Sequence, residues 1–141
     1  MKISARNILE GTVSDIKKGQ IMVVIKLILP SGTAISSIIT NESAERLGLK
    51  SGAKAYAIIK ASSVIMGKEV ASINISARNI IKGTVQKVKE GMIMAEIVLD
   101  IGGGNTITST ISDDSVKRME LKVGDEAYAI VKATSVMLGV S

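Results

Sequence analysis

The sequence predicts an all-β protein that consists of two tandem copies of one unit, each with one short helix. Three observations predict this. Residues 3–67 and 75–139 align without a gap at an offset of 75 − 3 = 72, with 33 identities in 65 pairs. Within each copy, runs rich in Ile, Val and Leu alternate with turns that contain Gly, Pro or Asn. In each copy, one of these runs leads into a helix-start signal.

The first three elements of the first unit are strands. Apolar runs predict strands at residues 8–16 and 20–29, separated by a turn at 17–19 whose glycine is expected to need a positive φ. Pro30-Ser31-Gly32-Thr33 predicts the next hairpin, and a third strand is expected at about 34–39. In the second unit, the glycine-rich turn at 102–105 takes the place of this second hairpin.

A short helix is expected to follow the third strand. Thr40-Asn41-Glu42-Ser43 combines a hydroxyl N-cap with an acid in the first turn, and Ser112-Asp113-Asp114-Ser115 repeats that chemistry. The helix is expected to end near Gly48, and a turn at 49–52 precedes the last strands at 54–59 and 62–66.

Four or five strands, with one short helix between the third and the fourth, are the order of an OB-like barrel. We therefore expect tandem duplicated OB-like barrels, as domains 1–68 and 73–141 joined by a segment around 68–74. A unit of this size is near the lower limit for a core that is stable alone. The two units are thus expected to pack on each other and on other chains.

The composition excludes several classes of function. The chain has 141 residues and a net charge of +5, and it contains no Cys, His, Trp or Phe. Disulfides, thiol nucleophiles, Ser-His triads and His-ligated metals are therefore excluded, and no acidic pair has acid/base spacing. We expect that the protein is not an enzyme. No apolar run approaches the ~18 residues of a membrane helix, and no signal peptide is evident, so a soluble, intracellular protein without a membrane partner is expected.

Ser4-Ala5-Arg6, which recurs as Ser76-Ala77-Arg78, is the first candidate site. On a strand, residues i and i+2 share a face, so the hydroxyl and the guanidinium would both donate hydrogen bonds to one oxyanion. The alternative is a solvated edge strand whose Arg pairs with a nearby carboxylate. Retention of this surface-type motif in both copies favours a functional role.

Lys60-Ala61-Ser62 and Lys132-Ala133-Thr134, which directly follow apolar strands, form the second candidate. A lysine between small residues can present its ammonium group while the backbone N–H groups stay approachable by a tetrahedral oxyanion. The alternative is an ordinary solvated lysine at a strand end. Thr40 and Ser112 are most simply helix caps; a helix N-terminus can also bind an anion, although the nearby acids would repel it.

Other features have simpler interpretations. Gly102-Gly103-Gly104 lacks the spacing of a phosphate loop and is expected to be a turn. Methionines are expected to fill the core; they include Met22, Met66, Met94 and Met137. Two tyrosines inside apolar strands cannot supply the aromatic platform on which OB barrels stack bases, so no nucleic-acid partner is expected. The competing interpretation is an OB-type interaction module that binds an acidic protein or nucleic acid.

The Ser-Ala-Arg-Asn tetrad, the Gly-Thr-Val that follows it and the Lys-Ala-Ser/Thr-Ser-Val near each unit's end resemble the molbindins, built from Mop domains. The resemblance covers nearly the whole chain and looks like the tandem, di-Mop form. It implies OB-like domains, homotrimers, a cytoplasmic location, and molybdate or tungstate as the bound ligand for molybdenum storage. The molybdenum is implied to be bound as the intact oxyanion, with no other cofactor, at interfaces between domains and subunits.

The resemblance also implies which residues bind the oxyanion. The tetrad maps to Ser4, Arg6, Ser76 and Arg78, the strand-end Lys-Ala to Lys60, Ala61, Lys132 and Ala133, and the hydroxyl before the helix to Thr40 and Ser112. Many family members have Asn where this chain has Met22 and Met94, which makes a further site at this hairpin doubtful. Because neither a helix-turn-helix segment nor a Walker loop is present, a free-standing store is expected rather than a regulator or a pump subunit.

Overall fold

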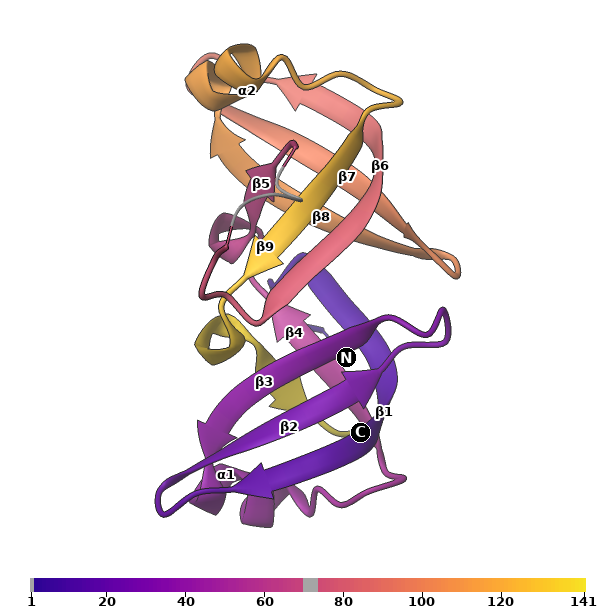
Figure 1. Cartoon of the computed structure of the whole chain (residues 1–141), viewed down its shortest axis with the longest axis vertical. Coiled ribbons are helices and arrows are strands. Elements are labelled where there is room, and N and C mark those ends of the chain that lie inside the picture. Colours follow the sequence, from indigo (N-terminus) through magenta and orange to yellow (C-terminus); the bar gives the residue numbers. More distant parts are fainter. Residues whose placement is uncertain (1, 70–73) are drawn as a thin grey trace.

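The computed structural model describes residues 2–69 and 74–141. Two β-barrel-like bodies are stacked along the long axis of the molecule, and the two short helices lie at its opposite ends (Figure 1). The expected boundaries at residues 1 and 73, and most of the expected joining segment, lie outside the described residues. No helix within the described ranges is long and apolar enough to cross a membrane.

Each repeat contains the same elements in the same order. The first comprises β1 (Asn7–Lys18), β2 (Met22–Ile28), β3 (Ala34–Thr40), α1 (Asn41–Leu47), β4 (Lys54–Ile59), the 3-10 helix η1 (Ala61–Ser63) and β5 (Ile65–Gly67). The second comprises β6 (Asn79–Glu90), β7 (Met94–Gly102), β8 (Asn105–Ser112), α2 (Asp113–Met119), β9 (Glu126–Val131), the 3-10 helix η3 (Ala133–Ser135) and β10 (Met137–Gly139). The predicted class, mostly β with one short helix per repeat, is confirmed.

Two details of the predicted elements are wrong. Residues 61–63 form a 3-10 turn, so the strand expected at 62–66 is shortened to 65–67. Gly19 does not take a positive φ. Instead, a Cβ at Gly19 would lie 2.9 Å from the carbonyl oxygen of Met22, so the hairpin requires glycine because the backbone approaches closely there.

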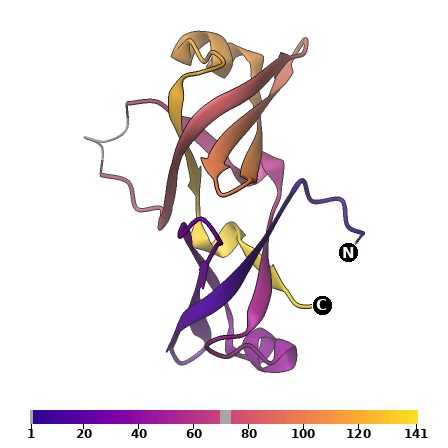
Figure 2. The ribbon, with the colours of Figure 1, turned by 90° about the vertical axis from the view of Figure 1, so that its right-hand side faces the viewer.

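The last strand of each repeat is exchanged between the two sheets. The first sheet has the order β10-β4-β1-β2-β3, and the second has the order β5-β9-β6-β7-β8. Met66 of β5 lies opposite Ala129 of β9, and Leu138 of β10 lies opposite Ala57 of β4, both in antiparallel pairs. Figures 1 and 2 show β5 in the body of the second repeat and the yellow C-terminal strand in the body of the first. The two curled five-stranded sheets match the predicted duplicated OB-like architecture, and each needs both repeats.

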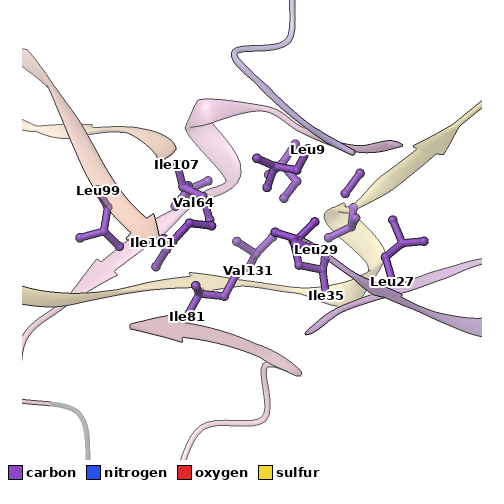
Figure 3. Packing of buried hydrophobic residues seen from close by; sticks show 14 of the residues in the cluster. Leu9, Leu27, Leu29, Ile35, Val64, Ile81, Leu99, Ile101, Ile107 and Val131 are labelled. Atoms are coloured by element: carbon purple, nitrogen blue, oxygen red, sulfur yellow. The ribbon is translucent and has the colours of Figure 1, made fainter. Parts of the chain in front are cut away.

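The hydrophobic core is continuous across the two bodies. Alternating positions of the strands point inward, as in β2, where Val23, Ile25 and Leu27 are buried. Leu29 and Ile35 of the first repeat belong to the same cluster as residues of the second, including Ile107 and Val131. Figure 3 shows these side chains in one group. The two repeats therefore share a single hydrophobic core.

The methionines fill the core only in part. Met66 is buried as predicted, but Met22, Met94 and Met137 are 40%, 47% and 50% exposed. Each of these three is the first residue of its strand, at an outward-facing position next to a residue that points toward the core. The prediction that they fill the core is therefore wrong.

Candidate functional site

Two pockets, one for each repeat, gather the residues that the sequence singled out. The first, which we call the Lys60 pocket, has a volume of about 300 Å³ and is lined by Ser4, Ala5, Arg6, Lys60, Ala61, Ser62 and Thr110. The second, the Lys132 pocket, has about 290 Å³ and is lined by Ser76, Ala77, Arg78, Lys132, Ala133 and Thr134, together with Ile38, Ile65, Ile75 and Ile130. The two candidate motifs, far apart in sequence, thus meet in space twice.

The strand register explains why these motifs meet. Asn7 at the start of β1 lies opposite Ile59 at the end of β4, and Asn79 lies opposite Val131 in the same way. Because the strands are antiparallel, the residues just before β1 adjoin the residues just after β4. Ser4 and Arg6 precede β1, so the expectation that they lie on a strand is wrong. The pocket still receives both side chains.

The fourth residue of the tetrad fixes each pocket to the other repeat. Asn7 is 2% exposed; its side-chain amide donates to the carbonyl of Thr108 at 2.8 Å, and its oxygen accepts from the Thr108 N–H at 2.7 Å. Asn79 makes the same two bonds to Ser36, both at 2.8 Å. The start of β1 is thereby fixed to β8, two residues from Thr110, which lines the Lys60 pocket.

A second pair of buried side chains supports this junction. The Ser37 hydroxyl donates to the carbonyl of Val136 at 2.6 Å, and the Ser109 hydroxyl donates to the carbonyl of Val64 at 2.6 Å. Val64 and Val136 directly follow η1 and η3, the 3-10 turns that begin at the pocket residues Ala61 and Ala133. These bonds hold each turn against a strand of the other repeat, so each pocket wall comes from both.

Thr40 and Ser112 lie outside the lining of both pockets. The Thr40 hydroxyl oxygen accepts a hydrogen bond from the Ser43 N–H at 3.1 Å and caps α1. Ser112 caps α2 in the same way, accepting from the Ser115 N–H at 3.1 Å. Within one chain, the structure therefore gives these two hydroxyls the role of helix caps.

The two pockets differ in the partner of their arginine. Arg6 forms an ion pair with Glu96 at 2.9 Å, and the hydrogen bond between them lowers the pKa of Glu96 and raises that of Arg6. Among residues 2–69 and 74–141, Arg78 makes no ion pair. It lines a cavity of about 480 Å³ whose charged residues are Asp15, Lys17, Lys18, Lys26 and Arg78 itself. The alternative of an arginine paired with a carboxylate thus holds for Arg6 only.

Lysine and hydroxyl groups complete the chemistry of both pockets. Lys60 and Lys132 are exposed, and the lining of neither pocket includes a carboxylate. The first N–H groups of a 3-10 turn have no partner within the turn, so η1 and η3 add backbone donors beside each lysine. Cations and donors without a carboxylate in the lining are suited to a small, fully deprotonated anion.

Sequence reasoning missed four residues that lie at or support these pockets. Asn7 and Asn79 had a signal, since a polar residue is kept in both copies directly before an apolar strand. Thr110 and Glu96 had none, because their equivalents in the first repeat, at 110 − 72 = 38 and 96 − 72 = 24, are Ile38 and Val24.

The comparison with protein families gives one match, present twice. The model of the TOBE domain matches residues 3–66 and 75–138, which together cover most of the chain. The matched segments agree with the repeat that the sequence shows.

Individual proteins are similar over the whole chain or over half of it. The molybdenum transport protein ModE of Herbaspirillum seropedicae is 35% identical over 99% of this chain and 52% of its own length. A probable molybdenum-pterin-binding protein of Haemophilus influenzae is 54% identical over 48% of this chain and 99% of its own length. The chain spans about half the length of those curated relatives that match it from end to end.

One solved structure is similar from end to end. It is the cytoplasmic molybdate-binding protein ModG with molybdate bound, at a TM-score of 0.97 and 39% identity, covering 100% of both chains. The same overall fold therefore occurs in a solved protein that this chain matches over its whole length.

Proposed function

Because the chain belongs to the TOBE-domain family, we propose that it binds molybdate, and also tungstate, as intact oxyanions and serves as a cytoplasmic store of molybdenum. One observation carries the proposal: Ser-Ala-Arg and Lys-Ala-Ser/Thr meet in a pocket in each of two repeats that share only about half of their residues. The ModG protein, described as a cytoplasmic molybdate-binding protein, supports the choice of ligand and location.

The chemistry of the pockets fits such a ligand. Molybdate carries two negative charges and only acceptor oxygens at neutral pH, so its partners must be donors. Lys60 and Arg6, with the hydroxyls of Ser4 and Ser62, supply them in one pocket; the equivalent residues supply them in the other. Charge-assisted hydrogen bonds are stronger than bonds between neutral groups. Four or five of them around one anion are compatible with a Kd in roughly the micromolar range or below. The protein binds the anion and carries out no reaction on it.

Self-association is part of the proposal. Thr40 and Ser112, implied as ligands by the resemblance to molbindins, lie outside both pockets of their own chain. We infer that they reach the pockets of neighbouring copies, so that the sites are completed between subunits of a homotrimer. Exposed apolar side chains support such contacts, since they recur at equivalent positions of both repeats as Ile3 and Ile75, Ile21 and Ile93, Met22 and Met94, and Ile65 and Met137.

Calorimetric titration of the full chain with molybdate, using sulfate as the reference anion, tests the proposed ligand. The unsubstituted protein is expected to give saturable heat with molybdate and tungstate. Lys60→Ala combined with Lys132→Ala should weaken binding at least about tenfold, because each site loses a charged donor. The melting temperature should hardly change, since both lysines are exposed.

Lys50→Ala with Lys122→Ala is the matched control. These lysines are also exposed and equivalent, at 122 − 50 = 72, and they line neither pocket. This control should bind molybdate like the unsubstituted chain. No heat with either oxyanion would overturn the proposal and favour the interaction module, which a gel shift with single-stranded DNA at low and moderate salt would then test.

A further inference from the structure

We propose that Glu96 makes the two oxyanion sites of each chain unequal, so that the Lys132 pocket binds first and the Lys60 pocket binds more weakly. This inference rests on the proposed function and concerns residues that differ between the repeats. It identifies a carboxylate that competes with the ligand for one arginine.

The strand register places Glu96 beside the Lys60 pocket, in the neighbouring cavity that Arg6 and Thr110 also line. On β7, Glu96 lies directly opposite Thr110 of β8, and Thr110 lines that pocket. Residues directly opposite on neighbouring strands share a face of the sheet. The equivalent pair in the first repeat is Val24 opposite Ile38, and Ile38 lines the Lys132 pocket. The same location thus holds a carboxylate at one site and an aliphatic side chain at the other.

The carboxylate of Glu96 occupies the arginine that the ligand needs. The Arg6 guanidinium and the Glu96 carboxylate are 2.9 Å apart, and the Glu96 side chain is 26% exposed. An oxyanion that binds Arg6 must either displace Glu96 or share the guanidinium with a like-charged neighbour. Arg78 has no such competitor among the described residues, so its donors are free for a ligand.

The charges around each arginine act in the same direction. The cavity next to Arg6 contains Arg6, Lys89, Glu90 and Glu96, a formal charge of 2 − 2 = 0. The cavity next to Arg78 contains Lys17, Lys18, Lys26, Arg78 and Asp15, a formal charge of 4 − 1 = +3. A dianion is therefore attracted more strongly to the Lys132 side, and the difference is largest at low salt.

One feature favours the other pocket but is weaker. Thr110 gives the Lys60 pocket a hydroxyl where the Lys132 pocket has Ile38. The Thr110 hydroxyl can donate only one hydrogen bond and carries no charge, whereas the guanidinium that Glu96 occupies has several donors and a full positive charge. The charge difference therefore outweighs the extra hydroxyl, and the order of affinities stays as proposed.

Molybdate titrations of the full chain at low salt test the inference in backgrounds that report one pocket each. Lys132→Ala leaves the Lys60 pocket, and Lys60→Ala leaves the Lys132 pocket. We expect the affinity of the Lys132 pocket for molybdate to be at least about tenfold higher than that of the Lys60 pocket. Adding Glu96→Gln to the Lys132→Ala chain should remove most of that difference.

Matched variants separate a local effect from a change in net charge. Glu126→Gln removes the same charge from a glutamate that pairs with Lys82 and lines neither pocket, so it should leave both affinities unchanged. Val24→Glu is the reciprocal change and should weaken the Lys132 pocket. If Val24→Glu fails to fold, the Glu96→Gln result decides alone.

Two outcomes would contradict the inference in different ways. Equal affinities of the two pockets, or a Lys60 pocket whose affinity Glu96→Gln leaves unchanged, would overturn it while the proposed function stands. A chain that gives no molybdate heat in any form would overturn the proposed function, and this inference with it.

Discussion

At the scale of single residues, the buried asparagine of each tetrad joins one repeat to the other through two hydrogen bonds. Replacing Asn7 by alanine would leave the N–H and C=O of Thr108 without partners at a position that is only 9% exposed. We expect a loss of about 3 kcal/mol in the free energy of unfolding, since each buried unpaired group costs about 1–3 kcal/mol. Urea unfolding of the two proteins measures this difference in the free energy of unfolding.

The exposed Asn74 is a matched control, because Asn74→Ala should change the free energy of unfolding by less than about 0.5 kcal/mol. An equal, small effect of both substitutions would show that the asparagine bonds do not hold the repeats together.

The meeting of Arg6 with Lys60 could be predicted at this scale, whereas the Glu96 contact could not. Motifs kept in both copies identified the donors, and the order of the strands brings them together. Glu96 stands 96 − 6 = 90 residues from Arg6, and its equivalent is Val24, so neither spacing nor repetition indicates it. Only the strand register reveals that contact.

At the scale of elements, the ends of the two helices differ in a way that predicts an asymmetric response to substitution. Gly48 after α1 has a φ of 66°, whereas Glu120, its equivalent after α2, has a φ of 53°. A side chain in this left-handed conformation is strained, so Glu120→Gly should stabilise the protein by about 1 kcal/mol. The bond that Lys68 donates to the Glu120 carbonyl would remain, because it involves only the backbone of Glu120.

Gly48→Ala is the reciprocal change and should destabilise by a similar amount, about 1 kcal/mol. Thermal unfolding of both variants measures the difference. A higher melting temperature for Gly48→Ala than for Glu120→Gly would contradict this account of the two caps.

The ion pair of Lys68 and Asp125 predicts a pH dependence at the end of the exchanged strand β5. The hydrogen bond from the Lys122 N–H, followed by the one from Lys68, lowers the pKa of Asp125 below its ordinary value of 3.8. Asp125 therefore binds its proton less readily when folded, and its stabilising contribution is complete above the ordinary pKa. It is lost as the pH falls through the lowered one.

Asp125→Asn should therefore be less stable than the unsubstituted chain at pH 7. The difference in melting temperature should shrink as the pH falls below about 3.8. A difference that is constant from pH 7 to pH 2 would show that the carboxylate charge does not contribute.

Most strands could be predicted from their apolar runs and turns, but the sheet that β5 joins could not. In the structure, residues 65–67 lie opposite Ile130, Ala129 and Tyr128. Within their own repeat they would lie opposite Ile58, Ala57 and Tyr56, which are the same three residue types. Both pairings bury equivalent side chains, so hydrophobic patterning does not distinguish them.

At the scale of the whole molecule, the exposed apolar tips of two β-hairpins indicate a surface through which copies of the chain associate. Ile21 is 73% exposed and Ile93 is 77% exposed, at equivalent positions of the two β-hairpins. If the proposed homotrimer forms, light scattering should give a mass of about 3 × 14.8 kDa. Ile21→Lys with Ile93→Lys should lower that mass, because a lysine in an apolar contact is costly.

Ser14→Lys with Gln86→Lys adds the same charges at exposed, equivalent polar positions and should leave the mass unchanged. A mass of one chain for the unsubstituted protein at concentrations that saturate molybdate binding would contradict the proposed assembly.

The exchange of β5 and β10 has a consequence for how such a chain could arise. A polypeptide holding one repeat would have a sheet that lacks its outer strand, and a strand that lacks its sheet. Two such polypeptides would complete one another, so the present chain is the covalent counterpart of a symmetric dimer. Joining the halves turns a bimolecular encounter into an intramolecular one, at an effective concentration on the order of millimolar. Once joined, the copies are free to diverge, as Glu96 and Val24 have.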